Sequence, residues 1–105
     1  MVYTENYNGV KLDVQAVDID ISENTKEVIH EAIDKMSRHT RDINFVDVYM
    51  KDEPHPVNSK TVRIRVGVPG EDAFADDAGE HFDPLIRSVT EKLIKQLEQK
   101  KAKQN

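Results

Sequence analysis

The residues best placed for chemistry are lysines near the end of the chain. Residues 87–105 hold six basic and two acidic side chains, whereas the whole chain holds 15 basic and 20 acidic ones. One flank of the helix predicted there carries no acid; its residues are Ser88, Lys92, Lys95, Gln99 and Lys103. Such a flank could bind an anion, above all nucleic-acid phosphate. The ordinary alternative is that these lysines solvate a C-terminal helix and complement its dipole, and both interpretations stay open here.

Two arginines on one face of a predicted strand could also bind phosphate. Arg63 and Arg65 alternate with apolar residues and so share one strand face. The planar guanidinium group suits phosphate because it can bind two oxygens at once. The alternative is an exposed strand that charge keeps soluble. If these arginines and the C-terminal lysines served one ligand, the surface would be a strip, which suits a nucleic-acid backbone.

Other chemistries find no support in the residue pattern. Residues 71–83 hold six carboxylates and His81, but their spacing does not match a calcium-binding loop, so we expect a solvated acidic edge. The four histidines fall on different predicted elements without zinc spacing, and there is no cysteine. No phosphate-binding glycine loop and no nucleophile elbow occurs. We therefore predict no metal, no cofactor, no small-molecule substrate and no enzymatic activity.

The pattern of apolar residues predicts an α+β fold that would carry these side chains. Strict alternation predicts strands, and apolar stripes at helical spacing predict helices. The predicted strands cover residues 10–16, 45–51, 61–68 and 73–77, and the predicted helices cover 22–39 and 83–103. Asp83 and Pro84 are typical of a helix start. We expect a bend near Ala16 and Val17, where the apolar set changes parity.

The order strand, helix, three strands, helix implies a largely antiparallel four-stranded sheet with both helices on one face. The other face would carry Arg63 and Arg65, open to solvent. We expect a flexible N-terminus at residues 1–9, one domain at 10–103 and a tail at 104–105. Residues 1–9 are polar, and Asn8-Gly9 within them is a turn signal.

Length and composition place limits on the class of protein. A chain of 105 residues favours one domain. No apolar run exceeds three residues, and the start lacks the pattern of a secretory signal, so we expect a cytoplasmic protein that does not enter membranes. The net charge of −5 argues against nucleic-acid binding over the whole surface and leaves room for a local basic patch.

Several local patterns, in this order, resemble the ribosome hibernation promoting factor family, which includes the ribosome-associated inhibitor A proteins and was once called sigma-54 modulation protein. They are LDVQA at 12–16, IDKM at 33–36, DI at 42–43, VDVYMK at 46–51, VRIRVGVPG at 62–70, FA at 74–75, EKL at 91–93, QL at 96–97 and KK at 100–101. The resemblance covers about residues 10–103, and it rests on the order of these weak motifs because none is diagnostic alone.

The resemblance implies a β-α-β-β-β-α two-layer sandwich similar to double-stranded-RNA-binding domains. It implies a protein that binds rRNA of the small ribosomal subunit, blocks the channel of messenger and transfer RNA, and inhibits translation in stress or stationary phase. We expect a monomer off the ribosome. By position, the family's rRNA-binding residues correspond to Lys92, Lys100 and Lys101, with Lys95 at a position that is often basic. Basic positions at the family's first helix and its end correspond to Lys35, Arg38 and Arg41.

The acidic balance of the chain keeps a second hypothesis open. The chain could be a protein-interaction or stress-regulatory module that has this fold and does not bind ribosomes. Recovery of a protein partner without ribosomal subunits would favour that hypothesis.

Overall fold

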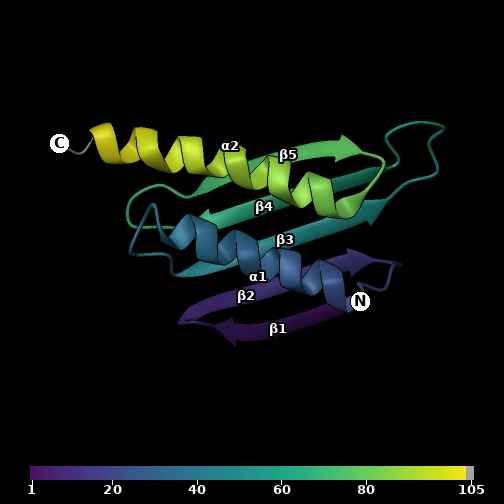
Figure 1. Ribbon diagram of the computed structural model, residues 1–105, viewed down its shortest axis with the longest axis horizontal. Coiled ribbons are helices and arrows are strands. Elements are labelled where there is room, and N and C mark those ends of the chain that lie inside the picture. Colours follow the sequence, from purple (N-terminus) through teal and green to yellow (C-terminus); the bar gives the residue numbers. More distant parts are fainter. Residues whose placement is uncertain (104–105) are drawn as a thin grey trace.

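A five-stranded sheet, with both helices lying across one of its faces, forms the frame of the molecule (Figure 1). The computed structural model describes the backbone of residues 1–103 and the side chains of residues 1–100. The strands are β1 (Val2–Tyr7), β2 (Val10–Val17), β3 (Phe45–Asp52), β4 (Lys60–Gly67) and β5 (Ala73–Gly79). The helices are α1 (Glu23–Ser37) and α2 (Phe82–Lys103). The α+β class and the placement of both helices on one face are confirmed.

The five strands lie in the sheet in the order of the chain. Only β2 and β3 run parallel, and α1 connects them; all other neighbours are antiparallel. Figure 1 shows α1 in front of β2 and β3, and α2 in front of β4 and β5. The sheet face away from the helices is therefore open.

The core lies between the sheet and the helices, as the apolar periodicity predicts. In β4, Val62, Ile64 and Val66 are buried while Arg63 and Arg65 are exposed. Both predicted helical stripes are buried; their residues are Val28, Ile29, Ala32, Ile33 and Met36 in α1, and Leu85, Ile86, Val89, Leu93 and Leu97 in α2. The described charged residues thereby lie on the open sheet face, the helix flanks and the connections, with Glu5 and Asp77 on the helix side of the two edge strands.

The sheet has a fifth strand that the sequence prediction missed, so the expected four-stranded sheet and flexible residues 1–9 are wrong. β1 pairs with β2 from Val2–Gln15 to Tyr7–Val10, and the two turn residues Asn8 and Gly9 both have positive φ. An Asn-Gly pair with positive φ makes the two-residue turn that suits a hairpin. The strand escaped notice because its inward side chains, Tyr3, Glu5 and Tyr7, are only half-buried and it has no apolar alternation.

The expected bend near Ala16 and Val17 is also displaced. β2 stays paired with β3 through Val17, and the chain turns at Asp18, whose φ is 55°. Aspartate tolerates this left-handed conformation better than most residues. The parity change in the apolar pattern therefore marks the end of β2 rather than a bulge inside it.

The starts of the two helices are tied together at one carboxylate. Ser22 caps α1 by accepting a hydrogen bond from the Thr25 amide at 3.1 Å. Asp83 lies in the first turn of α2, where it accepts hydrogen bonds from the side chains of Asn24 and Thr25, each at 2.7 Å. This tie fixes the helices side by side, so their C-terminal ends emerge at the same end of the molecule (Figure 1).

Gly67 offers a test of this packing. It pairs with Phe45 across β3 and β4, and the Phe45 ring occupies the place that a Cβ at position 67 would take. We expect Gly67→Ala to lower the free energy of unfolding by about 1–3 kcal/mol, the usual cost of overpacking. Urea unfolding measures this loss. In a Phe45→Ala background the same substitution should cost much less, and an equal cost in both backgrounds would contradict the assigned contact.

Candidate nucleic-acid interface

The structure places six of the predicted site residues in two groups. One group surrounds β5, and the other lies at one end of the molecule. Four of them surround β5 and are called the β5 strip here: Arg63, Arg65, Lys92 and Lys100. Arg38 and Arg41 lie at the end of α1, and with His39 they form what we call the end cluster. Lys35 lies between the helices, and Lys95 is exposed on α2. The side chains of Lys101 and Lys103 lie outside the described residues.

β5 is an edge strand, and side chains of α2 cover its outer edge. Gln96 donates to the carbonyl of Phe74 at 2.7 Å and accepts from its amide at 3.3 Å, as a neighbouring strand would. One turn before, Lys92 donates to the carbonyl of Asp76 at 3.0 Å; one turn after, Lys100 donates to the carbonyl of Glu71 at 2.6 Å. An uncovered edge strand invites pairing with another chain. Lys92 and Lys100 therefore have a structural role beside any role in binding.

The acidic segment supplies the counter-charges of the β5 strip. Arg65 pairs with Asp72 at 2.8 Å and Arg63 with Asp76 at 3.6 Å on the open sheet face. Around the edge, Lys92 pairs with Asp77 at 3.5 Å. The fourth cation, Lys100, lies 3.9 Å from Glu71. Four of the six carboxylates that we expected to form a solvated edge are thus partners of cations that we expected to bind phosphate.

Asp77 is the most firmly held of these carboxylates. It accepts hydrogen bonds from the Ala78 amide and the Ser88 hydroxyl, each at 2.9 Å, and Lys92 lies beside it. These contacts, the Ala78 amide first, hold the pKa of Asp77 below its ordinary value. Asp77 therefore keeps its charge beside Lys92 and anchors α2 to β5.

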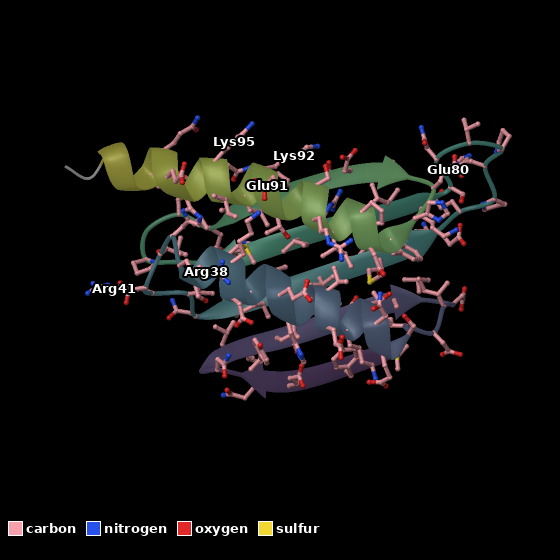
Figure 2. All side chains as sticks on the ribbon, in the orientation of Figure 1. Arg38, Arg41, Glu80, Glu91, Lys92 and Lys95 are labelled. Atoms are coloured by element: carbon pink, nitrogen blue, oxygen red, sulfur yellow. The ribbon has the colours of Figure 1, made fainter. Side chains whose placement is uncertain are left out.

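The end cluster is where positive charge is least neutralised. Arg38 caps the C-terminus of α1 and Arg41 follows in the connection to β3; both are exposed, and among the described side chains neither has an ion-pair partner. Figure 2 shows Arg41 pointing away from the body at this end. His39 pairs with Glu98 at 3.0 Å, and Asp42 lies on the same cavity wall. The cavity, about 580 Å³, also takes in Pro69 and Lys100, so three elements converge on it.

Lys35 forms an ion pair among the described side chains, whereas Lys95 does not. Lys35 forms an ion pair with Glu91 across the two helices, and this pair holds the pKa of Glu91 below its ordinary value. Figure 2 shows Glu91 on the side of α2 that faces α1, with Lys92 and Lys95 on the far side. Lys95 is exposed and forms no ion pair with the described side chains. Of the two, Lys95 has the charge that is less neutralised by the described side chains.

The open sheet face carries charges of both signs. Arg63 lies opposite Tyr49, and Arg65 lies opposite Asp47. Asp47 neighbours Asp13 in the register of β2 and β3. Partial burial, followed by the charge of Asp13, raises the pKa of Asp47. A polyanion on this face would meet these carboxylates, so the face is a poorer phosphate surface than its arginines alone suggest.

No cluster of metal ligands accompanies these groups. Within the described residues, no three His, Asp or Glu side chains converge as ligands of one ion. Neither helix, as far as it is described, has an apolar stretch long enough to cross a bilayer.

The chain belongs to a family of ribosome-related proteins. Residues 12–105 match the model of the family described as Sigma 54 modulation protein / S30EA ribosomal protein. This confirms the family recognised from the sequence motifs. No match was found among curated proteins.

Two solved structures share the fold. The N-terminal domain of Protein Y from Thermus thermophilus superposes with a TM-score of 0.71 at 12% sequence identity, covering 82% of this chain and 92% of that one. A ribosomal subunit interface protein from Coxiella burnetii superposes with a TM-score of 0.76 at 19% identity, covering 87% of this chain and 97% of that one. At these identities the likeness establishes the fold.

The cover of β5 can be tested with one glutamine. Gln96→Ala removes two hydrogen bonds to Phe74, and we expect the free energy of unfolding to fall by about 1–3 kcal/mol, since each such bond contributes roughly 0.5–1.5 kcal/mol. Chemical denaturation measures the change. Gln99→Ala, on the exposed side of α2, is the matched control and should be near neutral. Equal effects of the two substitutions would argue against the assigned role of Gln96.

The anchoring of Asp77 predicts a pH dependence. Because its folded pKa is lowered, its contribution to stability is present above the unfolded pKa of about 3.9 and is lost as pH falls through the folded value. The free energy of unfolding of the wild type should exceed that of Asp77→Asn near neutral pH, and the gap should close below about pH 4. Urea unfolding across pH measures the gap. Asp20→Asn, in the exposed connection between β2 and α1, is the control, and a pH-independent gap for Asp77→Asn would contradict the prediction.

Proposed function

We propose that this protein associates with the ribosome and inhibits translation as a hibernation factor. Its site would be the small subunit, where it would occupy the channel of messenger and transfer RNA. Membership of the Sigma 54 modulation / S30EA ribosomal protein family supports the association, as does the fold shared with a protein named for the ribosomal subunit interface. The mechanism is steric occupancy, in which side chains hold rRNA phosphates and no bond is made or broken.

The end cluster is the observation that carries the proposal. Arg38 and Arg41 present guanidinium groups that are exposed and, among described side chains, unpaired. An rRNA phosphate can bind there without first displacing a carboxylate. Arginine also gives bidentate hydrogen bonds to phosphate, which a lysine cannot.

The β5 strip would contribute less to binding than its number of cations suggests. Each of its four cations is already paired with an acid of residues 71–77. Exposed ion pairs are worth only about 0–1 kcal/mol, so rRNA phosphate can exchange with these carboxylates. The displaced carboxylates would then lie beside the polyanion and repel it. We rank the proposed contacts as Arg38 and Arg41 first, Lys95 next, and the β5 strip last.

Neutralising the end cluster tests this ranking. We expect Arg38→Gln/Arg41→Gln to weaken co-sedimentation with small ribosomal subunits by about tenfold or more, because charged hydrogen bonds are worth roughly 1.5–3 kcal/mol each. The slope of log affinity against log salt should also fall by about 0.7–0.9 for each phosphate that the variant no longer binds. Lys26→Gln, in the first turn of α1 at the opposite end of the same helix, is the matched control.

A second double variant, in the β5 strip, shows whether the end cluster or the open sheet face binds the ribosome. Arg63→Gln/Arg65→Gln should weaken binding less than the end-cluster pair does. A reversed order, in folded variants, would move the interface to the open sheet face. Wild-type binding of both double variants would reject all four arginines as contacts.

The second candidate function, an interaction module that does not bind ribosomes, is favoured by the internal pairing of the β5 strip and by the net charge of −5. The same sedimentation experiment distinguishes it. Absence of the wild-type protein from the ribosomal pellet even at low salt would support this candidate and overturn the proposal of ribosome binding.

A further inference from the structure

The two edges of the sheet differ in whether another element covers them. The outer edge of β5 is covered by Gln96 and its neighbours on α2, whereas no described element lies beyond β1 (Figure 1). β1 also lies outside residues 12–105, the part of the chain that matches the family model. The uncovered edge therefore lies outside the part of the chain that the family model matches.

Backbone hydrogen-bond parity identifies the groups exposed at this edge. The Ala16 amide donates to the Met1 carbonyl at 2.7 Å, and Tyr7 and Val10 close the two-residue hairpin. Odd-numbered residues of β1 therefore bond to β2, because ladder bonds alternate along an antiparallel strand. The amides and carbonyls of Val2, Thr4 and Asn6 point away from the sheet. These are the groups that an added strand would bind.

β1 carries few of the usual devices that block strand addition. Val2, Thr4 and Asn6 are exposed and uncharged, and the strand contains no proline or lysine. Its one charged side chain, Glu5, lies on the helix side and pairs with His30 of α1. Tyr7 is held on the same side, stacked on the His30 ring at 4.0 Å and donating to Asp34 at 2.9 Å. The strand is therefore rigidly presented with a neutral, open edge.

We propose that this edge pairs with β1 of a second copy of the chain, in antiparallel orientation about a two-fold axis at Thr4. In this register Thr4 faces Thr4 of the other copy, and Val2 faces Asn6 in both directions, so all outward backbone groups are paired. Glu5 then lies opposite Tyr3 of the other copy and never opposite another Glu5. Because α2 covers β5, the pairing cannot propagate from the far edge, and it closes as a dimer.

The dimer is a weak one. One strand from each copy buries far less than the roughly 1,600 Å² of a standard interface. Each copy also carries a net charge of −5, so the copies repel at low salt. Added salt should strengthen this association, whereas it weakens contacts with phosphate. A weak dimer departs from the monomer that we expected off the ribosome, and its formation does not depend on ribosome binding.

Single cysteines provide the test, since the chain has none of its own. In the proposed register the two Thr4 Cα atoms lie about 5.5 Å apart, within the roughly 4.4–6.8 Å range of a disulfide. Thr4→Cys should therefore form a covalent dimer on oxidation or with a short bis-maleimide. Asn6→Cys, on the same face of the same strand, should not, because its two copies lie about 13 Å apart along the strands. Mixing Val2→Cys with Asn6→Cys should cross-link the two variants to each other.

Sedimentation equilibrium at high protein concentration gives an independent readout. Wild-type protein should show a monomer–dimer equilibrium that shifts towards dimer with salt, and Thr4→Lys should be monomeric, since it places like charges opposite each other. Circular dichroism establishes that the variants are folded. Equal cross-linking of Thr4→Cys and Asn6→Cys, no cross-linking of either, or an unchanged equilibrium in Thr4→Lys would each overturn the proposal.

Discussion

The hydrogen bonds between the flank of α2 and the edge of β5 determine what the basic residues of this protein can do. Lys92, Gln96 and Lys100 stand one turn apart, and each reaches the backbone of residues 71–76. The helix thereby supplies the partner that the last strand lacks. As a result, the amino groups of Lys92 and Lys100 bond to the backbone of the fold, and the acids next to them are held close. The distribution of free charge follows from this arrangement.

Free positive charge is consequently concentrated away from β5. Two arginines without an ion-pair partner among the described side chains, Arg38 and Arg41, lie together at the end of α1, whereas Lys95 and Arg87 on α2 and Lys11 on β2 are single exposed cations. The hydrogen bonds from α1 to Asp83 bring the far ends of both helices to this place. An acidic protein can in this way present a local basic surface, because many of its carboxylates form ion pairs with its own cations elsewhere.

Much of the fold could be predicted from the sequence because the core follows simple periodicity; the stripe from Val28 to Met36 is buried as predicted. β1 was missed because its pairing depends on backbone bonds rather than on an apolar face, and its one signal was Asn8-Gly9, a turn that needs a strand on both sides. The candidate site was less predictable because its ion pairs join residues that are distant in sequence. Nothing in the sequence tells that Lys100 meets Glu71, since that contact needs α2 to lie along β5.

The shape of the molecule has a mechanical consequence. The body measures 45 × 27 × 19 Å, and the end cluster lies at one tip of the long axis, while residues 53–59 lie at the other (Figure 1). A rod held only at one tip pivots freely, so its far end sweeps a volume much larger than the molecule itself. Attachment through Arg38 and Arg41 would make the protein an obstacle by its reach as well as by its bulk.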